Sequence, residues 1–465
     1  MNLKRALCII SLYSVCFATL NAGPVEQYLQ FYQEQSVSLK NTAIKQLYFQ
    51  QSIDHNNPSL GTFAQRYYVD ERFSHSPNDP VFFYICGESA CSKRALNGAI
   101  REYAKQHHAK LLALEHRYYG ESLPFNSFSP ASLNYLSTKA ALKDLASFQE
   151  YMMDTQQWQG TWIAFGGSYP GSLSAYYRLH YPNLVAGALA SSAPVMAKED
   201  FYEYDAHINK VVNVDCANKM RQVTQIIESS LNDKPKLAHI KALFAASEVQ
   251  DSIDFLYLVA DTGAAAVQYG MKIEFCAALS NSPSALEGYA DFAQKLYQRM
   301  GVSAVEMTAQ GAMSENPNEY KNGVGMRQWF YQSCSEYGYW QNANHDASQA
   351  TRSSLINLDY HRQICARLFA INEPANTEAI NAQFYYPLMD SSVTNIYFTN
   401  GEQDPWSSLS LTEENGNVIN PNLSYYLIKE AAHCDDLHLP SEKDSSSLKQ
   451  ARKKMEQLLI KWLEE

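Results

Sequence analysis

Residues 161–171 read Thr161-Trp-Ile-Ala-Phe165-Gly-Gly-Ser168-Tyr-Pro-Gly171 and carry most of the information about the fold. The apolar run before the glycines predicts a short buried strand, and the segment that ends at His180 predicts a helix. A serine on a tight strand-to-helix turn between small residues is the nucleophile elbow of an α/β-hydrolase. Pro170 stands where a glycine is usual, but the first turn of a helix tolerates proline. The stretch therefore predicts that Ser168 is a nucleophile.

An elbow of this kind predicts an acid and then a histidine later in the chain. The strand-like run 393–398 leads into Asp404, and a second run, 423–428, leads into His433. In such a triad the histidine accepts the proton of the serine, and the acid holds the imidazole in the required tautomer. The sequence therefore predicts a triad of Ser168, Asp404 and His433.

Two other residues compete for these roles. Glu402 could serve as the acid in place of Asp404, and His438 could replace His433. Asp404 and His433 are preferred because each lies within a few residues of the end of a predicted strand.

The oxyanion hole of a hydrolase consists of backbone N–H donors. One donor is expected to be the N–H of Tyr169, directly after the nucleophile. The second is expected from Gly87, in the loop after the strand-like run 81–84.

Segments spread over nearly the whole chain resemble one family of serine peptidases. They include Glu115-His-Arg-Tyr-Tyr-Gly-Glu-Ser-Leu-Pro124, the elbow, Ala190-Ser-Ser-Ala-Pro194 and Ala432-His-Cys434. The family contains prolyl carboxypeptidase, dipeptidyl peptidase II and thymus-specific serine peptidase, and the His-Cys pair most resembles the thymus-specific branch. The resemblance implies a serine-type exopeptidase that cuts near the termini of short peptides through an acyl-enzyme, with no metal or cofactor.

The resemblance also implies two substrate-binding residues. The carboxylate of Glu88 could hold a substrate terminus, although it could equally be a loop acid bonded to backbone. Trp406 could pack on a proline ring. Prolyl carboxypeptidase would carry bulkier apolar residues at the positions of Ser172 and Leu437, so the sequence leaves a preference for proline open, together with the choice of terminus.

Seven cysteines follow residue 22, and the resemblance pairs four of them. It implies disulfides Cys216–Cys276 and Cys334–Cys365. Cys86 and Cys91 are close enough in sequence to close a small loop. Cys434 is left over, either as a reactive thiol beside the predicted catalytic histidine or as an inert buried one.

The N-terminus predicts export. Lys4 and Arg5 precede an apolar run, 6–18, and the small residues around Ala22 predict a cleavage site. Residues 1–22 are therefore expected to be a signal peptide, with the enzyme secreted, periplasmic or lysosomal. A lipoprotein cleaved before Cys16 is disfavoured by the bulk of Val15.

Composition and strand spacing predict the domain organisation. Strand-like runs alternate with helical stretches up to residue 195, become rare over 196–390, and return over 391–465. We expect an α/β-hydrolase domain, 23–195 and 391–465, with a mostly helical cap, 196–390, inserted into it.

The overall charge limits the partners. The net charge of −11 and the lack of a basic tract argue against nucleic-acid binding. Peptides are the expected partners, with no membrane association after signal removal, and homodimerisation is left open. Two other classes share these features, namely a secreted esterase or lipase with the same elbow and triad, and an inactive binding protein on a hydrolase fold.

Overall fold

The computed structural model describes residues 43–321 and 325–465, so the predicted signal peptide lies outside the described residues. At its centre is an eight-stranded sheet with the strand order β1-β2-β4-β3-β5-β6-β9-β10. β2 pairs antiparallel with β1 and β4, and all other neighbours are parallel. The strands are β1 (Lys45–Ser52), β2 (Thr62–Asp70), β3 (Val81–Ile85), β4 (Lys110–Leu114), β5 (Trp162–Gly167), β6 (Gly187–Ser191), β9 (Ile396–Gly401) and β10 (Ser424–Ile428).

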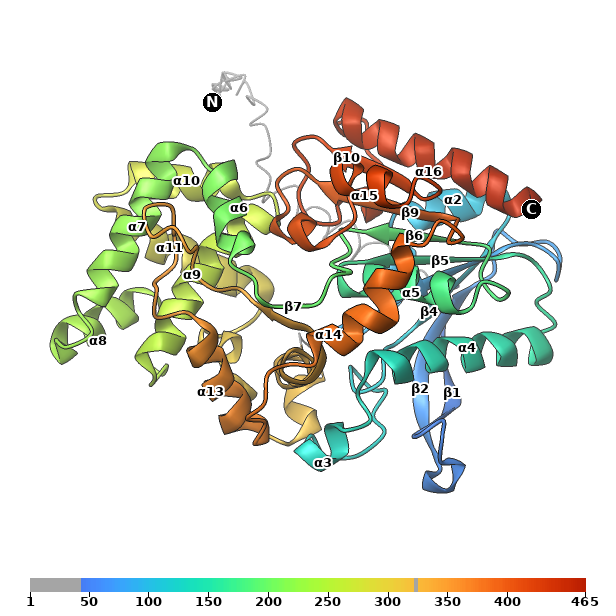
Figure 1. Cartoon of the computed structure of the whole chain (residues 1–465), viewed down its shortest axis with the longest axis horizontal. Coiled ribbons are helices and arrows are strands. Elements are labelled where there is room, and N and C mark those ends of the chain that lie inside the picture. The colour runs from blue at the N-terminus through green and yellow to red at the C-terminus, as the bar shows by residue number, and fades with distance from the viewer. Residues whose placement is uncertain (1–42, 322–324) are drawn as a thin grey trace, which may run out of the picture.

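Helices cover both faces of this sheet (Figure 1). α2 (Ala99–His107) and α16 (Ser446–Glu464) lie on one face, and α4 (Thr138–Thr155) and α5 (Tyr169–His180) lie on the other. The contact with α16 is close, because a Cβ added at Gly187 of β6 would lie 2.3 Å from the Trp462 ring. Parallel strands that are covered on both faces are mostly apolar. β3, β5 and β6 follow this rule, and all their residues except Tyr84 are buried.

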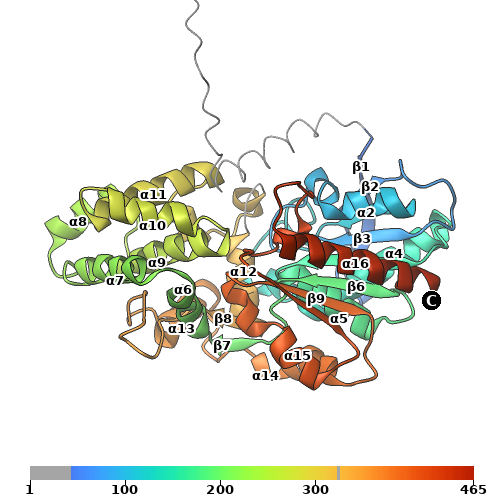
Figure 2. The same cartoon turned by 90° about the horizontal axis from the view of Figure 1, so that it is seen from above.

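The chain between β6 and β9, residues 192–395, is mostly helical and is called the insertion below. Figure 2 shows its helices α6 to α11 gathered beside the sheet. It also contains a two-stranded sheet of β7 (Lys198–Asp200) and β8 (Gly338–Trp340). Its α-helices are α6 (Glu203–Val211), α7 (Val214–Glu228), α8 (Lys234–Leu243), α9 (Ser252–Gln268), α10 (Lys272–Asn281), α11 (Ala285–Met300), α12 (Met326–Gln332), α13 (Leu358–Phe369) and α14 (Thr377–Ile380), and elsewhere the chain forms α3 (Pro130–Leu133) and α15 (Glu413–Ile419).

The architecture is an α/β-hydrolase fold with an inserted helical region, so the predicted fold class is confirmed. The boundaries of the cap at residues 196 and 390 stay a prediction. Within the insertion the structure adds one detail. α6 and α7 are separated at Asn213, whose side chain caps the start of α7 by accepting from the N–H of Cys216 at 2.8 Å.

The described cysteines form three disulfides and leave one thiol free. The bonded pairs are Cys86–Cys91, Cys216–Cys276 and Cys334–Cys365, which are the expected pairs, and Cys434 is the free thiol. None of the described helices is long and apolar enough to cross a membrane.

The partly buried carboxylate of Glu336 joins the insertion to the sheet domain. Glu336 accepts hydrogen bonds from the backbone N–H of Thr138, at 3.0 Å, and from its hydroxyl, at 2.8 Å. Thr138 is the first residue of α4, so the carboxylate occupies the positive end of that helix dipole. Burial nevertheless outweighs these hydrogen bonds and raises the pKa of Glu336 to about 7.

A raised carboxyl pKa makes stability depend on pH. Between the ordinary value of 4.5 and about 7, the folded state holds a proton on Glu336 that the unfolded state has released, so stability falls as pH rises through this window. Glu336→Gln, which is neutral at every pH, should therefore have a higher thermal midpoint relative to wild type at about pH 8 than at about pH 6. Calorimetry at both pH values measures this gap, and a gap that does not change with pH would contradict the assignment.

Candidate active site

Ser168 occupies a strained turn between β5 and α5. Its φ is +62°, a conformation that few residues other than glycine adopt. The turn is tight enough that a Cβ added at Gly166 would lie 2.0 Å from the carbonyl oxygen of Pro170. The N–H of Ser168 donates to the carbonyl of Ser191 at the end of β6, at 2.9 Å, and this bond holds the turn against the sheet. This is the geometry of a nucleophile elbow.

The two predicted oxyanion donors lie on either side of this turn. Tyr169 is the first residue of α5, and the first N–H groups of a helix have no acceptor within the helix. Gly87 follows β3 and packs on the elbow, since a Cβ there would lie 2.2 Å from Cγ of Pro170. Only a glycine lets the backbone of this loop come so near.

The predicted acid and histidine form a buried pair. Nδ1 of His433 lies 2.8 Å from Oδ2 of Asp404, and the other carboxylate oxygen accepts from the N–H of Trp406 at 3.0 Å. Asp404 is completely buried, and His433 is 7% exposed. Burial lowers the pKa of His433, but the Asp404 carboxylate and the Cys434 thiol outweigh it, so the pKa is raised above the ordinary imidazole value.

The alternative residues are engaged elsewhere. Glu402 accepts from the N–H of Glu430, at 2.9 Å. Nδ1 of His438 lies 3.7 Å from Oδ1 of Asp435. The structure therefore pairs His433 with Asp404 rather than with Glu402.

The loop that carries His433 lies against the elbow. A Cβ added at Gly167, directly before Ser168, would lie 2.9 Å from Sγ of Cys434 and 2.4 Å from Cδ1 of Leu437. The N–H of Cys434 donates to the hydroxyl of Ser192 at 2.9 Å. Cys434 is half-buried and packs between the two loops.

Asp436 anchors the same loop, and the sequence reasoning missed it. Its buried carboxylate accepts from the hydroxyl of Ser191, at 2.5 Å, and from that of Thr399, at 2.7 Å. It thereby ties the histidine loop to β9 and to the end of β6. An acid three residues after a predicted catalytic histidine was the available signal.

An aromatic pocket opens above Ser168. Its volume is about 360 Å³, which is within the usual range for a small-ligand site. Among the described residues, Glu88 and Asp261 are the acids that line it, and no Lys or Arg does. Burial raises the pKa of Glu88, although His433 opposes this. Most of the aromatic lining comes from the insertion, including Tyr204, Tyr257, Tyr297, Trp329, Tyr339 and Trp340.

Trp406 brings the sheet domain's own aromatic ring to this pocket. The ring packs on Phe201 at a centroid distance of 5.4 Å and on Tyr339 at 5.4 Å. Ser172, by contrast, is fully buried in α5 and does not line the aromatic pocket. The pocket therefore owes its shape to ring packing from the insertion.

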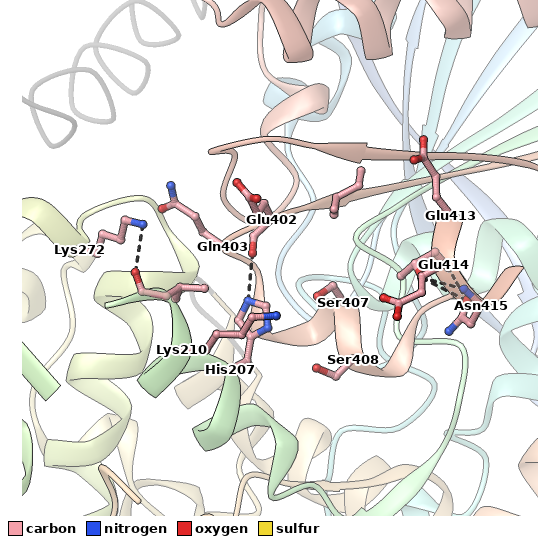
Figure 3. A pocket seen from close by; sticks show the side chains of 13 residues that line it. His207, Lys210, Lys272, Glu402, Gln403, Ser407, Ser408, Glu413, Glu414 and Asn415 are labelled. Carbon is pink, nitrogen blue, oxygen red and sulfur yellow. Dashed lines mark hydrogen bonds between the residues drawn. The ribbon is translucent and has the colours of Figure 1, made fainter. Parts of the chain in front are cut away.

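A second, larger groove lies beside the turn that carries Asp404. It has a volume of about 910 Å³ and separates the insertion from the turn that contains Asp404. Figure 3 shows His207 of α6 reaching the carbonyl of Glu402, and Lys272 on the insertion wall. Nε2 of His207 lies 3.1 Å from that carbonyl oxygen.

Comparison with known proteins assigns the chain to a family. The model described as "Serine carboxypeptidase S28" matches residues 51–455. A protein named "Probable serine protease EDA2", from Arabidopsis thaliana, is 36% identical over 78% of this chain and 76% of its own. The mouse "Thymus-specific serine protease" is 28% identical over 99% and 97%, and the human "Lysosomal Pro-X carboxypeptidase" is 28% identical over 87% and 86%.

The chain therefore belongs to the S28 family of serine peptidases, and it is a serine-type peptidase. The predicted family is confirmed. The thymus-specific proteases are among the relatives, in agreement with the predicted branch.

The elbow provides a test that does not depend on substrate. In Gly166→Ala, the new methyl group meets backbone atoms of Pro170 that cannot rotate away, so Ser168 must move. A displacement of about 1 Å at a reacting group costs roughly 100-fold in rate, so Ser168 should react more slowly by about that factor. The rate of labelling by a fluorophosphonate measures it. Gly301→Ala is the control. Its methyl group would meet nothing within 4 Å, so this variant carries the backbone strain of an alanine at φ +67° without displacing Ser168. Equal labelling of the two variants would contradict the close approach.

Proposed function

We propose that this chain is an exported serine exopeptidase that trims short peptides through a Ser168–Asp404–His433 triad. The observation that carries the proposal is the 2.8 Å contact between His433 and Asp404 beside a positive-φ serine. The family establishes that the chain is a peptidase, and we therefore prefer this function to an esterase or an inactive binding protein.

The residues divide the chemistry in the usual way. Oγ of Ser168 attacks the carbonyl carbon of the peptide bond, while His433 takes the hydroxyl proton. Asp404 fixes the tautomer and stabilises the imidazolium. His433 then gives its proton to the leaving amine as the C–N bond breaks, and a water molecule, deprotonated by His433, hydrolyses the acyl-enzyme.

The N–H groups of Tyr169 and Gly87 are proposed to hold the oxyanion. The N–H of Tyr169 stands at the positive end of α5, which favours developing negative charge. Gly87 is close enough to the elbow to donate from the opposite side.

The aromatic pocket is proposed to receive the end of a peptide. The insertion, with the predicted cap at 196–390, forms most of its walls and would exclude folded proteins. Of the two acids in the lining, Asp261 is paired with the buried Arg352 at 2.8 Å, so Glu88 is the one proposed to bind the ammonium of an amino terminus. Trp406 and its neighbouring rings offer flat apolar faces that would accept a proline ring.

Export is proposed from two features. Residues 1–22 have the pattern of a signal peptide, and three disulfides suit an oxidising compartment. Secretion, the periplasm and the lysosome all meet this condition.

The first functional prediction concerns the nucleophile. Ser168→Ala should lose turnover by a factor on the order of 10⁴ or more, as removal of a triad member does. A labelled fluorophosphonate should mark Ser168 in the wild type, as read by peptide mass spectrometry. Unchanged labelling of the alanine variant would show that another serine reacts.

The second functional prediction concerns the site of cleavage. A library of unblocked short peptides should be cut one or two residues from an end, because the insertion walls the pocket. The amino end should be preferred, because Glu88 is proposed to bind it. Mass spectrometry that assigns both new termini measures this. Matched peptides with acetylated amino termini are the control and should be cut more slowly, whereas efficient internal cleavage of long, end-blocked chains would contradict the proposal.

A further inference from the structure

The last residue of α9 contacts both loops of the predicted catalytic pair. α9, Ser252–Gln268, belongs to the insertion, while Asp404 and His433 lie on loops of the sheet domain. We propose that Gln268 is a positioning residue, through which the insertion becomes part of the catalytic centre. This inference rests on the proposed roles of Asp404 and His433.

The first contact is made by the backbone. The N–H of His433 donates to the carbonyl of Gln268 at 2.9 Å. The last carbonyls of a helix lack donors within the helix, so His433 supplies a donor that this helix end needs. The ring of Tyr269, the next residue, lies 6.3 Å from the His433 ring. His433 is thus held at the negative end of α9, where the helix dipole favours the imidazolium formed during catalysis.

The second contact is made by the side chain. Oε1 of Gln268 accepts from the indole N–H of Trp406 at 3.0 Å and from the hydroxyl of Tyr204 at 2.7 Å. The backbone N–H of Trp406 in turn donates to Asp404. Because Gln268 is only 8% exposed, water cannot easily replace it as the acceptor. The amide oxygen therefore fixes the turn that presents the Asp404 carboxylate.

Other contacts keep the insertion against the same two loops. Nε2 of His207, on α6, lies 3.1 Å from the carbonyl oxygen of Glu402, on the far side of the acid turn (Figure 3). A Cβ added at Gly270 would lie 3.5 Å from Cβ of Ala432, next to His433. The insertion cannot move away from the sheet domain without releasing the acid turn and the histidine loop together.

The test replaces the amide and keeps the length of the side chain. Gln268→Met removes the Oε1 acceptor but leaves the backbone bond to His433. We expect kcat on a good peptide substrate to fall roughly 10- to 100-fold, because the catalytic groups are misplaced. Gln268 also lines the aromatic pocket, so kcat and its pH profile, rather than KM, carry the test. Asp404 raises the pKa of His433, and a less firmly held carboxylate would raise it by a smaller amount in the variant than in the wild type. The acidic limb of the kcat profile should therefore move to lower pH.

Two further variants separate positioning from stability. Gln149→Met is the matched control, because Gln149, in α4, is a buried glutamine that accepts from the Tyr177 hydroxyl at 2.7 Å and donates to the carbonyl of Leu184 at 2.6 Å rather than to the loops of Asp404 and His433. It should cost similar stability and leave kcat unchanged. Gln268→Glu keeps an acceptor for Trp406 and should recover most of the lost kcat.

The outcomes decide the proposal. A Gln268→Met enzyme with wild-type kcat and an unmoved acidic limb would overturn it, as would an equal loss in Gln149→Met. Asp404→Asn is measured in parallel, with an expected loss of roughly 10⁴ in turnover. If that variant stays active, the proposed catalytic pair itself is wrong, and this failure is read independently of Gln268.

Discussion

The close approach of Gly166 and Pro170, on the two sides of Ser168, constrains the rest of the site. The carbonyl of Pro170 occupies the place where a side chain at Gly166 would begin, and the side chain of Pro170 does the same for Gly87. A serine at φ +62° costs free energy that the surrounding structure must offset. The bond to Ser191 and the burial of β5 and α5 offset it, and in doing so they fix the direction in which the hydroxyl points.

The insertion is connected to this centre at every functional element. The hydroxyl of Tyr169, the residue after Ser168, lies 3.0 Å from Nε2 of His116 and accepts from Nε2 of Gln332, in α12, at 2.9 Å. Gln268 reaches the acid turn and the histidine loop. The residue after Ser168, the turn that carries Asp404, and His433 therefore each contact the insertion. A lid that only shielded the pocket would not require these hydrogen bonds, so the insertion forms part of the framework that holds the site.

The sequence predicted those features that depend on local pattern. The elbow needs small residues at fixed positions, and β5, β6, β9 and β10 are apolar runs, so the fold class and the residues after these strands could be found. β1 escaped prediction as a strand, because as an edge strand it is largely exposed and has no long apolar run. The roles of Gln268 and Asp436 depend on contacts between segments far apart in the chain. A single glutamine in a helix carries no signal of such a contact.

The strand order also has a consequence for when the molecule forms. β6 pairs with β9, so Ala188 meets Ile396 only after the whole insertion has been made. Closing so long a loop is entropically costly, and pairings between distant strands form late in folding. Ser168 is therefore synthesised long before Asp404 and His433. On the proposed triad, a chain that ends before β9 would lack both groups that activate the serine, so proteolysis would have to await completion of the sheet.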